Sequence, residues 1–181
     1  AFYSRLGEAA TASLDLEAIV QFAEKAQDWE ESVESASLSD VNVIDNPVRV
    51  GVAHDPAFCF YYPDNFALLE QAGGSLCQFS PMNDVSIPDV DVLYLGGGYP
   101  EIYANALANN SSMRQSIKTF AENGGVIYAE CGGLLYLTNA LKDFDGTQYQ
   151  MVGVIPAEGV MSRGHMTLGY RALTLTQTSP I

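Results

Sequence analysis

The 181-residue sequence has few basic residues and no long hydrophobic run. Lysine and arginine total 8 against 22 aspartate and glutamate residues, so the formal net charge is −14. A surface of that sign repels nucleic-acid phosphates and anionic lipid headgroups, which argues against nucleic acid and membranes as partners; its simplest role is solubility. No apolar run approaches the ~18 residues of a membrane-spanning helix, and the first residues do not form a basic region followed by an apolar one. These absences predict a soluble, cytoplasmic protein.

Cysteine is also scarce. The three cysteines, Cys59, Cys77 and Cys131, are too few and too scattered for a disulfide framework. No C-x-x-C pair is present, so we predict no zinc or other metal site. Cys59 and Cys77 lie in apolar or strand-like runs and are expected to be small core residues.

Cys131 lies in a different setting, the stretch Gly124–Leu137, which reads GGVIYAECGGLLYL. Residues 126–129 are a β-prone apolar run, 130–133 form a tight turn, and helix-compatible apolar residues follow. A cysteine at such a turn stands clear of the sheet, and the N–H groups at the start of the helix favour its thiolate form. The pattern is the cysteine counterpart of the hydrolase nucleophile elbow. The alternative is a buried structural cysteine beside two turn glycines.

The pattern along the chain indicates an N-terminal helix, a linker and one compact domain. From Ser13 or Asp15, either a plausible N-cap, apolar residues fall on one helical face, which predicts a helical segment over residues 1–29. Residues 30–47 are rich in serine and acidic residues and predict an exposed linker. The compact domain is expected over residues 48–181.

Strands and helices alternate within that domain. Strands are predicted at residues 48–53, 75–79, 90–95 and 126–129, with later strands around 151–154 and at 170–176. Helices are predicted at 65–71 with Asp64 as its cap, from Pro100 onward, at 112–122, and from Leu134 through Leu141. Alternation of this kind predicts an α/β fold with three layers, a mostly parallel sheet with helices on both faces.

Sites in such sheets form beyond the C-terminal ends of the strands. That rule places His54-Asp55, the turn Gly96–Gly98 and Cys131 on one rim. The glycine turn lacks the spacing of a nucleotide-binding loop. Its unobstructed N–H groups suit an oxyanion hole together with the N–H of Gly132, although a purely steric role for the glycines is the alternative.

A cysteine nucleophile also needs a base, and the sequence offers two histidines, His54 and His165. His54 ends a predicted strand on the expected rim, where a hydrogen-bonded structural histidine is the simpler interpretation. His165 lies in a predicted loop, where a solvated side chain is the simpler one. Glu101 and Glu130 flank the two turns.

Three motifs together resemble a known family. These are the runs Ala129–Leu137 (AECGGLLYL), Leu95–Glu101 (LGGGYPE) and Asp55–Asn65 (DPAFCFYYPDN), supported by Leu168–Arg171 (LGYR). They are similar to the C-terminal glutaminase domains of the cobyrinic acid a,c-diamide synthase family, over about residues 48–171.

The resemblance implies a class I glutamine amidotransferase domain of flavodoxin-like architecture. Cys131 would attack the glutamine amide, Gly97 or Gly98 with Gly132 would hold the oxyanion, and Asp55, Tyr99 and Glu101 would lie at the site rim. Ammonia would pass to an ATP- and magnesium-dependent synthetase domain that amidates the a and c carboxylates of cobyrinic acid in cobalamin biosynthesis. Residues 1–29 would be the end of that domain, and no cofactor is expected on this chain, which has no P-loop.

The family's general-base histidine lies well after the Leu-Gly-Tyr-Arg run, whereas His165 precedes it. The resemblance therefore implies a domain that is incomplete at its C-terminus, with a base beyond Ile181, that is acylated poorly and turns over little glutamine alone. A stand-alone cysteine hydrolase or redox-stress protein of the same superfamily, and a non-catalytic partner module, are the alternatives. These residues do not distinguish a cobalt from a nickel tetrapyrrole acceptor, or one oligomeric state from another.

Overall fold

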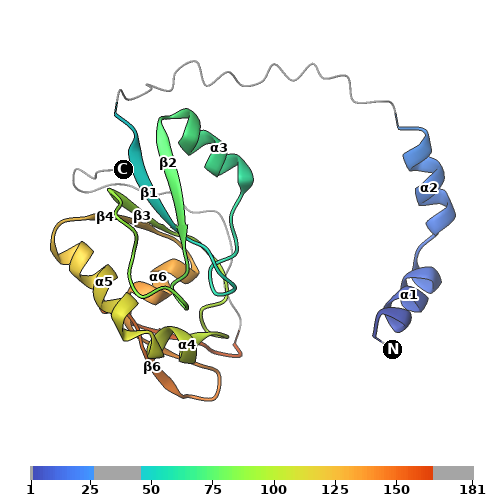
Figure 1. Cartoon of the computed structure of the whole chain (residues 1–181). Coiled ribbons are helices and arrows are strands. Elements are labelled where there is room, and N and C mark those ends of the chain that lie inside the picture. Colours follow the sequence, from blue (N-terminus) through green and yellow to red (C-terminus); the bar gives the residue numbers. More distant parts are fainter. Residues whose placement is uncertain (1, 27–45, 165–181) are drawn as a thin grey trace, which may run out of the picture. The chain divides into compact units, whose positions relative to one another are not determined.

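The structure, a computed structural model, describes residues 2–26 and 46–164 (Figure 1). The chain divides into two units, Ala1–Asp40 and Val41–Ile181, and each is described by itself. The predicted linker core, the strand at 170–176 and His165 lie outside the described residues.

The first unit contains two helices, α1 (Phe2–Ser13) and α2 (Leu16–Glu24). Asp15 is the N-cap of α2, and its side chain accepts a hydrogen bond from the Ala18 N–H at 2.9 Å, which confirms the predicted helix start. Helix α1 lies within the predicted helical segment 1–29, but the sequence placed a helix start only at Ser13 or Asp15, because residues 1–12 offer no capping signal. Neither helix has a buried residue. Among the described helices, none has the length and apolar character needed to cross a membrane.

The second unit is built on a parallel four-stranded sheet. Its strands are β1 (Val48–Ala53), β2 (Gly74–Phe79), β3 (Val92–Leu95) and β4 (Val126–Ala129), in the order β2-β1-β3-β4. All three pairings are parallel, which confirms the predicted α/β fold. The C-terminal ends of the four strands therefore lie at one edge of the sheet.

Helices pack on both faces of this sheet (Figure 1). On one face, α3 (Pro63–Gln71) contributes Phe66 and Leu69 to a cluster with Val50, Val52 and Tyr94. On the other face, α4 (Ala104–Asn109), α5 (Ser111–Glu122) and α6 (Gly132–Leu137) share a larger core with Leu93 and Leu95. Alternate residues of β3 thus enter opposite clusters, as the period of a strand requires.

Two predicted elements after Cys131 are wrong. Helix α6 ends at Leu137, and the predicted continuation to Leu141 is instead the strand β5 (Thr138–Lys142). The predicted strand at 151–154 is instead a connection between β6 (Gln148–Gln150) and β7 (Ile155–Val160), buried at Met151 and Val152. These three strands form a second sheet in the order β6-β5-β7. A short continuous apolar run is compatible with helix or strand, so periodicity did not separate the two.

Smaller differences concern caps and cysteines. Helix α3 begins at Pro63 with Tyr62 as its N-cap, so Asp64 lies inside the first turn and does not cap the helix. Proline suits that first position because its φ is already helical. Pro100 does not start a helix, since α4 begins only at Ala104. Cys59 and Cys77 are exposed and are not core residues; Cys77 lies on the edge strand β2.

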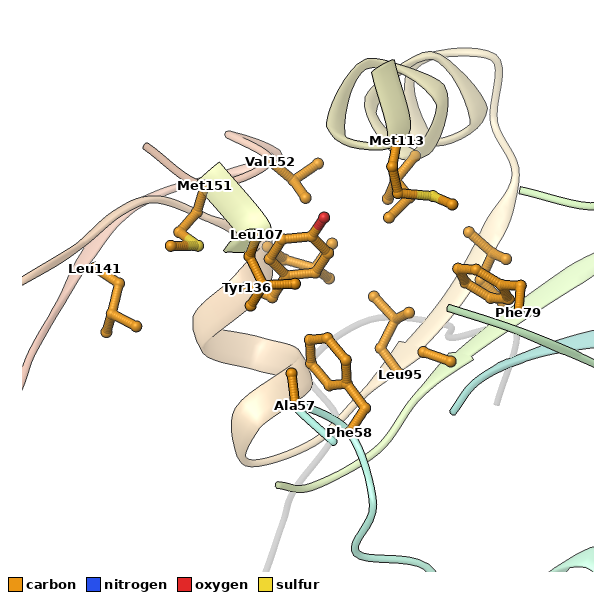
Figure 2. Packing of buried hydrophobic residues seen from close by; sticks show 14 of the residues in the cluster. Ala57, Phe58, Phe79, Leu95, Leu107, Met113, Tyr136, Leu141, Met151 and Val152 are labelled. Atoms are coloured by element: carbon orange, nitrogen blue, oxygen red, sulfur yellow. The ribbon is translucent and has the colours of Figure 1, made fainter. Parts of the chain in front are cut away.

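The larger core joins the segments that carry the candidate site. Figure 2 shows Tyr136 in the middle of the cluster, with Phe58 and Leu95 on one side and Val152 on the other. The rings of Phe58 and Tyr136 lie 5.4 Å apart between centroids. Phe58 follows β1, Leu95 ends β3 and Tyr136 belongs to α6, so this packing fixes three loops relative to one another.

Candidate active site

Cys131 occupies the sharp turn between β4 and α6. Its side chain is exposed, and its backbone has φ 50° and ψ −113°. Among the described residues it is the one non-glycine residue with positive φ. Such a conformation is unfavourable for an L-residue and persists only where the surroundings enforce it. The structure thus has the elbow that the sequence predicted, with the thiol presented to solvent.

Close backbone packing enforces this turn. The N–H of Glu130 donates to the Leu95 carbonyl at 3.0 Å, and the N–H of Gly133 donates to the Gly96 carbonyl at 2.9 Å. A Cβ at Gly133 would lie 2.1 Å from the Leu95 carbonyl oxygen. Only glycine permits this approach, so α6 starts directly against the end of β3.

The Gly96–Gly98 turn lies beside the elbow. A Cβ placed on Gly97 would lie 3.6 Å from the Cβ of Cys131, and one on Gly132 would lie 3.2 Å from the Gly98 nitrogen. The two turns that the sequence placed on one rim are therefore in contact.

Hydrogen bonds fix the orientation of the peptide planes in this turn. The Gly97 carbonyl accepts a hydrogen bond from the Phe60 N–H at 3.1 Å. Because C=O and N–H point in opposite directions across a trans peptide, the Gly98 N–H points away from Phe60. Phe60 and Gly97 face each other as an isolated antiparallel bridge, so the Gly97 N–H is directed at Phe60. The Gly98 N–H donates no hydrogen bond to any residue within 2–26 or 46–164. One unpaired donor, the Gly98 N–H, thus lies beside an exposed thiol.

Asp55 lies in this region, and both of its carboxylate oxygens accept hydrogen bonds within the protein. Its side chain is buried, with the residue 8% exposed. One carboxylate oxygen accepts from the N–H groups of Ala57 at 2.8 Å and Phe58 at 3.3 Å, and the other from Ser80 Oγ at 2.9 Å and the Met82 N–H at 3.0 Å. Asp55 therefore ties two loops together.

The remaining predicted residues lie around the two turns. His54 is exposed, its N–H donates to the Phe79 carbonyl at 2.8 Å, and its ring stacks on Tyr61 at 5.9 Å between centroids. No hydrogen bond in the described part of the chain joins His54 to Cys131. Tyr99 is 52% exposed, and Glu101 is half-buried in the turn ahead of α4.

Glu130, next to Cys131, accepts a hydrogen bond from the Tyr94 hydroxyl at 2.9 Å. Burial and this carboxylate together raise the pKa of Tyr94 to about 12, so its hydroxyl remains a donor at neutral pH. The contact joins β3 to the residue that precedes the thiol.

Sequence reasoning missed two residues of this region, Tyr61 and Tyr94. The dense aromatic run 58–62 was visible, but nothing in it distinguished a core ring from one whose hydroxyl binds the glycine turn. In the described ranges, no group of three or more His, Cys, Asp or Glu side chains is arranged to hold a metal ion.

Comparison with known proteins gives a consistent result. Residues 49–179 match the sequence profile of the CobB/CobQ-like glutamine amidotransferase domain. Among curated proteins, the cobyrinate a,c-diamide synthase of Syntrophotalea carbinolica is 44% identical over 166 residues, which cover 91% of this chain and 35% of that protein. The enzymes of the same name from Synechococcus sp. and Methanococcus maripaludis are both 43% identical, over 85% and 87% of this chain and 36% and 33% of their own length.

The chain thus spans about a third of the length of these relatives. The match over residues 49–179 includes the elbow at Cys131 and the Gly96–Gly98 turn. On these findings, this chain belongs to the family of CobB/CobQ-like glutamine amidotransferase domains.

Proposed function

We propose that this chain is the glutamine-hydrolysing part of a cobyrinate a,c-diamide synthase. The observation that carries the proposal is the exposed Cys131 thiol, held at φ 50° beside the unpaired N–H of Gly98. A nucleophile beside preorganised donors is the arrangement that acyl transfer requires. The names and the sequence identity of the relatives support glutamine as the acyl donor.

In this proposal, Cys131 Sγ attacks the side-chain amide carbon of glutamine. The carbonyl oxygen becomes an oxyanion, which the N–H groups of Gly98 and Gly132 stabilise; each donor of this kind contributes ~3 kcal/mol. The C–N bond then breaks, the nitrogen leaves as ammonia after taking a proton, and a glutamyl thioester remains on Cys131. Water hydrolyses the thioester, releases glutamate and restores the thiol.

The base that takes the thiol proton is a separate part of the proposal. By resemblance to the family, it is a histidine that follows the Leu168–Arg171 run. His54 is a poor candidate because its ring stacks on Tyr61 and no hydrogen bond in the described part of the chain joins it to Cys131. His165 precedes the run and is not assigned the role.

The destination of the ammonia follows from the relatives and not from this chain. We propose that a synthetase part, absent from these 181 residues, binds ATP and magnesium and amidates the a and c carboxylates of its tetrapyrrole substrate. The sequence here contains no P-loop to bind ATP. This chain would contribute the ammonia source only.

Covalent labelling tests the proposal without requiring turnover. A chloroketone with the shape of glutamine should alkylate Cys131, as the thiolate displaces chloride. Each reagent's rate at Cys131 is divided by its rate with free cysteine. The ratio should be at least tenfold higher for the glutamine-shaped reagent than for chloroacetone. Mass spectrometry locates the label. Cys59→Ala and Cys77→Ala are matched controls at exposed cysteines outside the elbow and should leave the rate unchanged, whereas Cys131→Ala should abolish it. Equal labelling of all three cysteines would contradict the proposal.

Glutamine hydrolysis tests the partnership with a synthetase. The chain alone should release little glutamate, and addition of the remaining two thirds of a relative such as the Syntrophotalea carbinolica enzyme should raise the rate. A Cys131→Ala chain in the same mixture is the control. If the added synthetase part does not change the rate of glutamate release, the proposed partnership is wrong.

A further inference from the structure

We propose that Tyr61 is a positioning residue for the oxyanion-binding turn, with its hydroxyl setting the orientation of Gly96 and thereby helping to aim the N–H of Gly98 at the acyl group. The inference rests on the proposed glutaminase function. It concerns a residue outside the nucleophile and the glycine turn.

The hydroxyl of Tyr61 bridges the ends of two strands. It donates a hydrogen bond to the Ala53 carbonyl at the end of β1, and it accepts one from the Gly96 N–H at 2.9 Å, just after β3. Direct pairing of β1 with β3 ends at Val52 and Tyr94. The phenol oxygen therefore continues the connection between these strands beyond the point where their own pairing stops.

The ring of Tyr61 is held in place on several sides. Its centroid lies 5.2 Å from those of Phe66 and Tyr94 and 5.9 Å from that of His54. It also packs directly on Gly96, where an added Cβ would lie 2.3 Å from the ring carbon Cε1. A ring fixed in this way places its hydroxyl with little freedom. Burial raises the pKa of the Tyr61 phenol, so the group keeps its proton and remains a donor to Ala53.

Gly96 transmits this constraint to the turn. Its N–H is bound by Tyr61, and its carbonyl accepts from the Gly133 N–H at 2.9 Å. Because the Gly96 carbonyl and the Gly97 N–H share one planar peptide unit, fixing the first fixes the second. The next peptide unit is fixed by the bond from the Phe60 N–H to the Gly97 carbonyl. Tyr61 thus secures the Leu95–Gly96 peptide plane, which leads into the planes held by Gly133 and Phe60. The last of these planes presents the free Gly98 N–H.

Tyr61→Phe tests the inference, since it keeps the ring and removes only the hydroxyl. In the 181-residue chain, we expect kinact for the glutamine-shaped chloroketone at Cys131 to fall about tenfold, less than the loss of a whole oxyanion donor. KI should remain within about twofold of the wild-type value, because the amino-acid part of the reagent does not contact Tyr61 in this scheme. The rate with iodoacetamide, which develops no oxyanion, should not change.

The matched control is Tyr62→Phe, the same change at the next residue. Tyr62 is 60% exposed, and its hydroxyl makes no hydrogen bond to a described residue. All three rates should equal those of the wild type. If Tyr61→Phe does not fold, 3,5-difluorotyrosine at position 61 retains ring and hydroxyl but weakens the oxygen as an acceptor for Gly96, and kinact should fall about two- to threefold.

The outcomes separate the two proposals. A wild-type chain without selectivity for the glutamine-shaped reagent would overturn the proposed function. A selective wild type whose kinact is unaffected by the loss or weakening of the Tyr61 hydroxyl would overturn this inference alone. An equal loss of rate with iodoacetamide would also overturn it, because the substitution would then act on Cys131 itself.

Discussion

Replacing Cys131 with glycine should give a more stable protein than replacing it with alanine. At φ 50° and ψ −113°, a residue with a Cβ is strained by ~1–3 kcal/mol. Alanine keeps the Cβ and hence the strain, whereas glycine releases it and loses ~0.4–1 kcal/mol through the greater freedom of the unfolded chain. The expected net gain of Cys131→Gly over Cys131→Ala is about 1 kcal/mol.

Urea denaturation gives this difference as a shift in midpoint at constant slope. Calorimetry should show a melting temperature about 4 °C higher for glycine than for alanine. The matched control is Cys59, an exposed cysteine whose φ is not positive. There, glycine should be the less stable of the two variants. If Cys131→Gly were no more stable than Cys131→Ala, the backbone at the elbow would not be strained, and the account of how the thiol is presented would be wrong.

Three further predictions concern the packing around the site and its tyrosines. Gly133→Ala should destabilise the domain by about 3 kcal/mol in urea denaturation, because its Cβ would lie 2.1 Å from the Leu95 carbonyl oxygen; an unchanged midpoint would refute the close packing. Gly97→Ala should leave the midpoint nearly unchanged, since its Cβ meets Phe60 at 3.4 Å and Cys131 at 3.6 Å, yet slow labelling by the glutamine-shaped chloroketone more than tenfold; normal labelling would show that the acyl group lies elsewhere. Burial raises the pKa of three phenols close to the site, so the folded state binds these protons more tightly than the unfolded state. Their contribution to the free energy of unfolding should be fully present below about pH 10 and should fall as the pH rises further. Circular dichroism between pH 9 and 12 should follow this loss of stability. A stability that stays constant to pH 12 would contradict the prediction. These phenols belong to Tyr61, Tyr94 and Tyr136.

The sequence was informative where structure is local. The strands at 48–53 and 126–129 are apolar runs bounded by turn residues, and the elbow at Cys131 follows from a strand and two glycines. The run after Cys131 was less informative, because Leu134–Leu141 is apolar apart from Thr138 and Asn139 and only its tertiary surroundings divide it between α6 and β5.

The parts of the site that were missed depend on partners distant in sequence. Asp55 was visible as an acid at the end of a strand, but its bonds to Ser80 and Met82, 25 and 27 residues away, could not be inferred from local pattern. The hydroxyl of Tyr61 meets Gly96 from 35 residues away. Roles of this kind are set by tertiary contacts, which periodicity and propensity do not report.

The shared core of Phe58, Leu95 and Tyr136 also determines when reactivity arises during the life of the chain. The three loops of the site are separated by stretches of the sequence that must all be synthesised before their core residues can pack. Contacts this distant in sequence form late in folding. A nascent or partly unfolded chain would therefore carry an ordinary cysteine at position 131. Its selectivity for glutamine would report that folding is complete.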